Sequence, residues 1–400
     1  MRVYLYHDGL GELSPLTDLR PSFAVRTGAL TTLDRLMGLL ERTSEHQLAG
    51  LIVPEGLAAL TAESITDTPV NPPIDSTAPV LLVNGRWVLP DAAIDSLKPG
   101  HALVEDASKG IMAACVEPNG VEAVLAGDAG SLETRPVSSR QLLSKPWHVR
   151  TLRDEAIRRD LDVLTPQTDS ASKTGYLATI DPAATVHPSA VLETEQGHIV
   201  IAAGATVRPF ATIIGPAYIG PGSTVAEHTV IRPNTAIGPV CKVAGEVAGV
   251  IFQGHANKGH AGFLGDSWVG AWVNLGAGTV NSNLLNTYSQ VLARATPTSS
   301  TERTGETFLG ATIGDHVKTA INTRLMTGTI VGTGTMWAAS MPISGCVEPF
   351  TWATDAGQHR FRLNKFIETA RLMMARRKIE PGEAYLNRLS ALHAVSSPSP

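Results

Sequence analysis

Aliphatic side chains recur at every sixth position through much of the second half of the chain. Small residues, glycine and proline fill most of the positions between them. A six-residue period is typical of one short strand followed by one corner, and three such units close a triangular coil with the aliphatic residue inside. The pattern therefore predicts a parallel β-helix over residues 176–348. The unbroken part of the register consists of Ile201, Val207, Ile213, Ile219, Val225, Ile231, Ile237 and Val243.

The register is interrupted twice. It is lost between Val243 and Phe263, in a glycine-rich stretch that holds His255, Lys258 and His260, and again over residues 284–309. Connections that leave a rigid solenoid often carry function. We therefore expect both stretches to be loops, and the first to contribute to a site. His255 and Lys258 can equally be solvated loop residues.

The remaining parts of the chain have different patterns. Residues 1–140 interleave short apolar runs with a helical pattern over 30–43, which predicts an α/β domain. A charged helical pattern predicts a linker over 141–175. The pattern of apolar residues over 349–400 predicts a helical cap on the β-helix, and the composition of 395–400 predicts a disordered tail. The apolar runs expected to form strands are 1–7, 48–54, 79–89, 101–107 and 121–127.

Composition excludes several classes of protein. The formal net charge is −5 and only 17% of residues are charged, which argues against a general nucleic-acid binder. No run of about 20 apolar residues is present, so we expect no membrane span and no secretory signal. Cys115, Cys241 and Cys346 lie far apart and predict reduced, structural thiols in a cytoplasmic protein.

Two motifs carry a resemblance to a known family. The stretches His260–Asp266 and Val273–Thr279 resemble the acetyltransferase domain of the bifunctional N-acetylglucosamine-1-phosphate uridyltransferase/glucosamine-1-phosphate acetyltransferase family. Leu13–Leu36 and Gly314–Thr323 further resemble a less studied group of sugar nucleotidyltransferases with the same helix. The resemblance implies a nucleotidyltransferase-like N-terminal α/β domain, a left-handed β-helix of hexapeptide repeats, and a homotrimer.

The resemblance also implies a site for acetyl transfer from acetyl-CoA. His260 matches the base that takes a proton from the acceptor's amino group, and an imidazole suits this task near neutral pH. Glu246 matches a glutamate that could orient or polarise this imidazole. Arg232 and Asn274 match residues that bind the phosphorylated sugar, and Asn274 could instead hydrogen-bond turn backbone. The positions that match the acetyl-CoA cleft between subunits are Ala277, Asn283 and Ala339.

The chain departs from the family pattern at several of these positions. Ala248 stands where the family has a phosphate-binding lysine, and Lys258 could replace that charge. Phe263 takes the place of a substrate-binding tyrosine, Leu284 that of another tyrosine, and Ile321 that of a serine at the coenzyme. Each change removes a hydrogen-bonding or charged group. The acceptor can therefore be a sugar phosphate or a nucleotide sugar other than glucosamine 1-phosphate.

The N-terminal domain departs further. Nucleotidylyltransferases carry a G-x-G-T-R loop that cradles the triphosphate, whereas this chain reads HDGLGELSPLTDLRPS. Arg20 and Arg26 could meet a nucleotide phosphate, or could make structural contacts. Arg86 stands where the family has a metal-binding aspartate, and an arginine cannot hold Mg²⁺. We therefore expect Mg²⁺ only if this domain is active, and the histidines indicate no other metal site.

Three functions are compatible with these patterns. The first is acetyl transfer to the amino group of a sugar phosphate or nucleotide sugar, a step of the kind used in UDP-N-acetylglucosamine biosynthesis. The second is transfer of a nucleotidyl group to a sugar 1-phosphate by the first domain. The third is a non-catalytic trimeric scaffold or sugar-nucleotide sensor.

Overall fold

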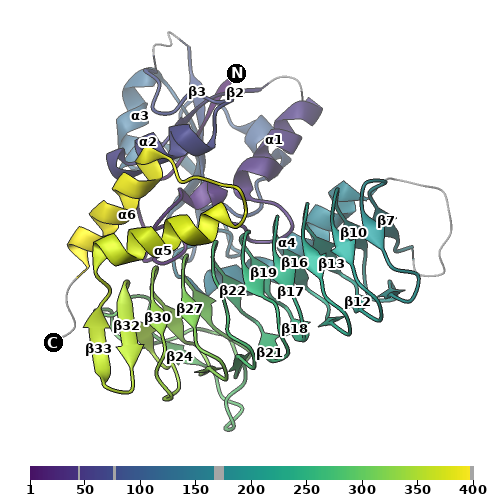
Figure 1. Cartoon of the computed structure of the whole chain (residues 1–400). Coiled ribbons are helices and arrows are strands. Elements are labelled where there is room, and N and C mark those ends of the chain that lie inside the picture. Colours follow the sequence, from purple (N-terminus) through teal and green to yellow (C-terminus); the bar gives the residue numbers. More distant parts are fainter. Residues whose placement is uncertain (44–45, 75–77, 166–174, 397–400) are drawn as a thin grey trace. The chain divides into compact units, whose positions relative to one another are not determined.

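The computed structural model describes residues 1–43, 46–74, 78–165 and 175–396, which form two compact units (Figure 1). Unit 1 comprises Met1–Val25, Leu30–His148 and Gly382–Leu389. Unit 2 comprises Arg26–Ala29, Val149–Pro381 and the chain from Ser390 onward. The predicted tail falls largely outside the described residues. No helix in the described part of the chain is long and apolar enough to cross a bilayer.

Unit 1 contains a mixed sheet in the order β2-β1-β3-β5-β4-β6. β1 pairs in parallel with β2 and β3, whereas β5 runs antiparallel to β3 and β4. The strands are β1 (Arg2–Tyr6), β2 (Gln47–Ile52), β3 (Val80–Asn84), β4 (His101–Glu105), β5 (Ile111–Val116) and β6 (Glu133–Val137). The helices are α1 (Thr32–Thr43), α2 (Glu55–Ser64), α3 (Val121–Leu125), η1 (Ser22–Ala24), η2 (Ala92–Ser96) and η3 (Pro118–Gly120).

One strand prediction in unit 1 is wrong. The run 121–127 contains α3, because Val121 and Val124 are buried on one side while Glu122 is exposed, a helical spacing. The strand that pairs with β3 and β4 is instead β5, which is absent from the predicted runs and whose residues are all buried. Only Ile111 and Val116 of its six residues are β-branched, and alanine is depleted in strands, so the sequence gives little strand signal there.

Unit 2 is the predicted left-handed parallel β-helix, with three faces (Figure 1). The first face contains β7 (Ala178–Ile180), β10 (Ile199–Ile201), β13 (Ala217–Ile219), β16 (Thr235–Ile237), β19 (Ile251–Phe252), β22 (Trp268–Val269), β26 (Thr312–Ile313), β29 (Ile330–Val331) and β31 (Cys346–Val347). The second contains β8 (Thr185–Val186), β11 (Thr206–Val207), β14 (Thr224–Val225), β17 (Lys242–Val243), β20 (Asn257–Lys258), β27 (Lys318–Thr319), β30 (Met336–Trp337), β32 (Thr351–Thr354) and β33 (Gly357–Arg360). The third contains β9 (Val191–Glu193), β12 (Thr212–Ile214), β15 (Val230–Ile231), β18 (Glu246–Ala248), β21 (Phe263–Gly265), β23 (Val280–Asn281) and β28 (Arg324–Leu325).

A continuous aliphatic column fills the β-helix. The eight residues of the unbroken register are each at most 1% exposed, because each points inward from its strand. The stretch 284–309 leaves the coil and contains the hairpin of β24 (Leu292–Ala293) and β25 (Glu302–Arg303). This second interruption is therefore an insertion, as expected.

The first interruption is not a loop, and this expectation is wrong. The chain between Val243 and Phe263 continues the coil through β18, β19 and β20, and its inward residues include Val247 and Phe252. The six-residue count fails because the corners are tighter there. Gly245 and Gly249 adopt φ of 78° and 63° at these corners, a conformation that glycine reaches without strain.

The first inward residue after this stretch lies one position later than the six-residue count predicts, whereas Val269 and Leu275 lie in the column at their predicted positions. Leu264, not Phe263, is the inward residue, and it is fully buried against Val247 of the neighbouring strand. Phe263 is half-buried and faces outward, next to Glu246. An outward aromatic ring beside an acidic side chain is available for contacts outside the column.

One helix precedes the β-helix strands in the sequence and two follow them. They are α4 (His148–Leu164), α5 (Leu363–Ala375) and α6 (Glu383–Val395). From α4, Arg153 donates from Nη1 to the carbonyl oxygen of Gly249, 2.5 Å away. The predicted linker helix therefore packs on unit 2.

α5 lies along one corner of the β-helix (Figure 1). At this corner His255, Trp272, His316 and Phe350 all adopt φ between 54° and 62°, so their side chains leave successive coils in the same direction. The ring of Phe366 on α5 packs edge-on against His316 and Phe350, with centroid distances of 5.6 and 4.9 Å. α5 thus covers the corner over the last coils.

Candidate functional site

His260 lies on the turn that follows β20 and is exposed. Within the described residues its imidazole has no side-chain hydrogen bond. Its main-chain carbonyl accepts a hydrogen bond from Nζ of Lys258, 3.0 Å away. The structure therefore places a free imidazole on a backbone that is tied to the interior of the coil.

Lys258 occupies a different place from the one expected. It pairs in register with Val243 and points into the β-helix, where it is 2% exposed. Its Nζ also donates to the carbonyl oxygen of Ala244 at 2.7 Å. Burial lowers the pKa of this ammonium to about 8. The side chain is fully used inside the coil, and the idea that it reaches a substrate phosphate from a loop is wrong.

Glu246 and Arg232 form an ion pair on the outer surface of the third face. Nε of Arg232 lies 2.5 Å from Oε1 of Glu246, and both side chains are exposed, by 52% and 39%. The structure thus joins two predicted site residues to each other and gives Glu246 no bond to His260 among the described residues. Phe263 follows Glu246 in register on the next strand. Arg232, Glu246 and Phe263 therefore share one outer face.

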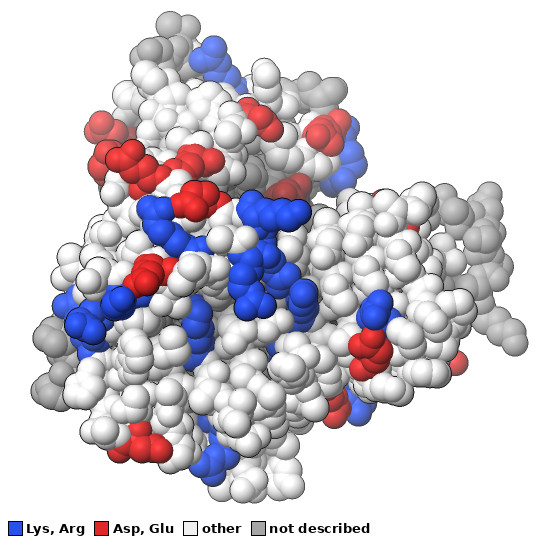
Figure 2. Space-filling model, in the orientation of Figure 1, with Lys and Arg blue, Asp and Glu red and all other residues white. Residues whose placement is uncertain are grey.

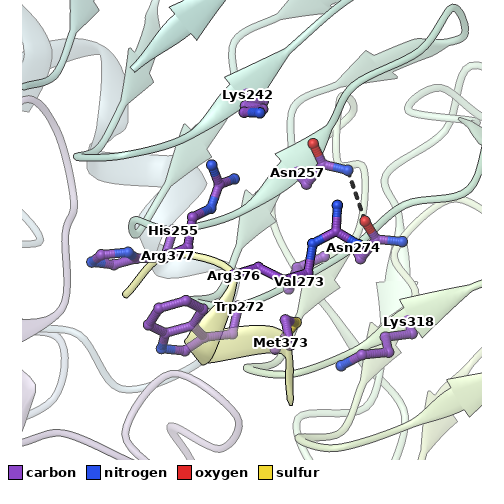
Figure 3. A pocket seen from close by; sticks show the side chains of 10 residues that line it. All are labelled: Lys242, His255, Asn257, Trp272, Val273, Asn274, Lys318, Met373, Arg376 and Arg377. Carbon is purple, nitrogen blue, oxygen red and sulfur yellow. Dashed lines mark hydrogen bonds between the residues drawn. The ribbon is translucent and has the colours of Figure 1, made fainter. Parts of the chain in front are cut away.

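Asn274 lies on the second face, between β20 and β27. Its Oδ1 accepts a hydrogen bond of 2.7 Å from Nδ2 of Asn257 (Figure 3). Both amides line a pocket of about 350 Å³ together with Lys318 and the end of α5. The sequence predicts only Asn274 as a site residue of this pocket, because Lys318 and the end of α5 are distant from it in the chain.

The three positions expected to line an acetyl-CoA cleft are placed differently. Ala277 is half-buried and its carbonyl oxygen accepts from the Asn322 amide, whereas Ala339 is 6% exposed. Asn283 donates from Nδ2 to Oδ2 of Asp266 at 2.8 Å. Its amide nitrogen is therefore engaged within the chain.

Asp266 is a residue whose role the sequence did not reveal. Its Oδ1 lies 2.9 Å from Nε of Arg150 and 2.8 Å from Nη1 of Arg153, both on α4. Together with the bond from Asn283 this makes Asp266 the acidic anchor of α4 on the β-helix. The charged pattern over 141–175 predicts a helix but does not identify this partner.

The two predicted nucleotide-binding residues of the N-terminal region, Arg20 and Arg26, both contact protein groups. Arg20 donates to the carbonyl oxygen of Leu16. Arg26 is held to the β-helix, where its amide donates to Oε1 of Gln253 and its guanidinium bonds main-chain oxygens. These contacts favour structural roles for both arginines.

The loop of unit 1 that begins at Asp8 is closed by Arg86. Nη2 of Arg86 lies 2.6 Å from Oδ2 of Asp8, and the two side chains are 4% and 2% exposed. Nδ2 of Asn84 donates to the same oxygen at 2.9 Å. A guanidinium already neutralises this carboxylate, so these residues do not fit Mg²⁺. No cluster of three or more His, Cys, Asp or Glu side chains suited to a metal occurs in the described part of the chain.

Comparison with known proteins bears on both units. Residues 5–169 match the family model described as sugar nucleotidyl transferase. A protein of Acaryochloris marina named bifunctional protein GlmU is 28% identical over 198 residues, which cover 49% of this chain and 37% of the relative. Its namesake in Sphingopyxis alaskensis is 34% identical over 136 residues, or 33% and 28% of the two chains. The chain is thus similar to proteins named GlmU over part of its length. It spans 37% and 28% of the length of these two relatives.

Two solved structures are weakly similar to this chain. The N-acyltransferase AntD of Bacillus cereus, solved with dTDP and coenzyme A, is 11% identical with a TM-score of 0.24, over 50% of this chain and 91% of AntD. PerB of Caulobacter crescentus, solved with CoA and GDP-perosamine, is 12% identical with a TM-score of 0.21, over 86% and 93%. Scores this low do not by themselves establish a common fold.

Proposed function

We propose that the protein transfers an acetyl group from acetyl-CoA to an amino group of a sugar phosphate or nucleotide sugar, with His260 as general base. The observation that carries this proposal is the exposed imidazole of His260 on a turn whose carbonyl is held by Lys258. A base must be both accessible and fixed in position to take a proton during attack. The similarity to proteins named GlmU supports the same class of reaction.

The proposed reaction forms one bond and breaks another. The neutral amine attacks the thioester carbonyl, so that a carbon–nitrogen bond forms while the carbon–sulfur bond of acetyl-CoA breaks. His260 accepts the proton that the nitrogen loses, and the coenzyme leaves as its thiol after receiving a proton. Arg232 would meet the acceptor's phosphate, since a planar guanidinium suits this task. We further propose a homotrimer, in which Ala277 and Ala339 line the acetyl-CoA cleft.

The test is release of free CoA from acetyl-CoA across a panel of amino-sugar phosphates and nucleotide amino sugars. A general base contributes roughly 10²- to 10⁴-fold, so His260→Ala should lower the turnover with the best acceptor by about that factor. His228→Ala is a matched control, because His228 is also an exposed turn histidine of the β-helix. Equal rates for His260→Ala and the unmodified protein would overturn the assignment.

A second candidate function is nucleotidyl transfer by unit 1. The match of residues 5–169 to the sugar nucleotidyl transferase model favours it. It predicts release of pyrophosphate from a nucleoside triphosphate in the presence of a sugar 1-phosphate. Binding of a sugar nucleotide without either reaction would instead support the non-catalytic scaffold or sensor.

A further inference from the structure

A strongly cationic pocket lies on the second face of the β-helix, beneath the end of α5 (Figure 3). Its floor is made by outward residues of successive coils, and its rim by three residues at the end of α5. Basic side chains gather in this part of unit 2 in the space-filling view (Figure 2). The pocket is lined by Lys242, His255, Asn257, Trp272, Val273, Asn274, Lys318, Met373, Arg376 and Arg377.

Four basic side chains face this pocket without a carboxylate among the lining residues. Lys242 and Lys318 come from the same column of the second face. Arg376 and Arg377 come from the end of α5. None of the four forms an ion pair within the described residues. Such a concentration of charge is unfavourable without a counter-charge, and it is unexpected in a chain whose net charge is −5.

The floor adds neutral hydrogen-bonding groups and an aromatic wall. Asn257 and Asn274 bond each other through one donor and one acceptor, which leaves further amide atoms for a ligand. His255 stacks on Trp272 at a centroid distance of 4.4 Å. Nδ1 of His255 is buried and has no hydrogen-bond partner among the described residues. Burial also lowers the pKa of Lys318 to about 8, so an anion beside it would favour its charged form.

We propose that this pocket binds the diphosphate group of a phosphorylated ligand. Four cations match the two to three negative charges of a diphosphate better than the charge of a single phosphate, and arginine forks suit phosphate oxygens. A volume of about 350 Å³ also exceeds what one phosphate group fills. The diphosphate can belong to a nucleoside diphosphate or to coenzyme A. The site does not include His260 but shares Asn274 with the predicted sugar site. For coenzyme A or a nucleotide sugar the inference rests on the proposed acetyl transfer, and it adds where the diphosphate of that substrate binds.

The experiment is calorimetric titration of the full chain with pyrophosphate, phosphate, UDP and coenzyme A at two salt concentrations. We expect pyrophosphate to bind more tightly than phosphate and to weaken at high salt. Arg376→Gln/Arg377→Gln should weaken pyrophosphate binding at least about tenfold, because charge-assisted hydrogen bonds are lost. Lys242→Gln, at an exposed position, should weaken it less and serves as a second variant that keeps the fold.

The control is Arg371→Gln, which lies on the same helix but is paired with Glu380 and should leave the affinity within about twofold. UDP or coenzyme A binding identifies the source of the diphosphate, and either supports the proposal. Absence of pyrophosphate binding at millimolar concentration, no preference over phosphate, or unchanged affinity in the double variant would overturn it. His260→Ala should bind pyrophosphate normally, so failure of the acetyltransferase proposal is separable from failure of this one.

Discussion

Nζ of Lys258 lies inside the β-helix, 3.0 Å from the carbonyl oxygen of His260 on the surface. Lys258 occupies an inward position that neighbouring coils fill with valine. Burial away from water disfavours the charged ammonium and lowers its pKa to about 8. Burying the ammonium costs stability, and its hydrogen bonds to the carbonyl groups of Ala244 and His260 offset part of this cost. The interior of the coil thereby fixes the turn that carries the proposed base.

This burial predicts a pH-dependent stability that Lys258→Met should remove. In the unfolded chain the ammonium loses its proton near 10.5, but in the folded chain near 8. Between these values the unfolded state holds more protons, so stability rises with pH. The rise amounts to about 3 kcal/mol for this lowering. The difference in thermal midpoint between the unmodified protein and Lys258→Met should therefore change by several degrees from pH 7 to pH 10.

The contributions of all other titrating groups cancel when the unmodified protein is compared with Lys258→Met. Lys318, whose pKa burial also lowers to about 8, is present in both and contributes equally. If the midpoint difference is the same at pH 7 and pH 10, Lys258 does not titrate as a buried group. His260-dependent turnover in Lys258→Met then tells whether the anchored carbonyl matters for the reaction.

Asp266→Asn should loosen α4 from the β-helix. Arg153 is 5% exposed and would lose the carboxylate beside its Nη1, and Arg150 would lose the same partner. Loss of one member of a largely buried ion-pair cluster should cost about 2–4 kcal/mol. We expect a lower thermal midpoint and faster proteolysis within 149–164. Asp154→Asn is the control, because Asp154 also pairs with Arg153 but is 48% exposed; an equal effect of both changes would contradict the anchor.

Arg86→Met should destabilise unit 1. The change leaves the carboxylate of Asp8, 2% exposed, with Asn84 but without its cation. An unpaired buried charge costs roughly 3–5 kcal/mol, and replacement of both partners recovers much of that loss. Asp8→Asn/Arg86→Met should therefore melt above Arg86→Met in differential scanning calorimetry. Equal melting of the single and double variants would contradict the idea that an unpaired Asp8 carboxylate destabilises Arg86→Met.

The six-residue register predicted the β-helix because each coil repeats one inward aliphatic residue. It failed over 244–262, where glycines at positive φ shorten the corners and Lys258 fills an aliphatic position. A count that requires equal spacing and apolar side chains cannot follow either change. The count therefore predicts a loop over this stretch and places Phe263, instead of Leu264, at the inward position.

The site could be predicted only in part. A family resemblance named His260, Arg232 and Asn274 singly, but pairings such as Arg232 with Glu246 depend on which strands become neighbours. The cationic pocket could not be predicted, since its arginines lie more than a hundred residues beyond Asn274 in sequence. Only the packing of α5 along the corner brings them to the second face.

That packing gives a last prediction, in which Phe366→Ala weakens pyrophosphate binding from outside the pocket. Phe366 is 2% exposed among Phe350, Phe361 and His316, and truncation of such a ring costs about 3–5 kcal/mol. α5 should then leave the corner more often, and the arginines at its end would lose their position. Calorimetry should show several-fold weaker binding together with a lower thermal midpoint. Leu372→Ala, 66% exposed on the same helix, should change neither, and a Phe366 variant that binds pyrophosphate with full affinity would mean that the pocket does not depend on α5.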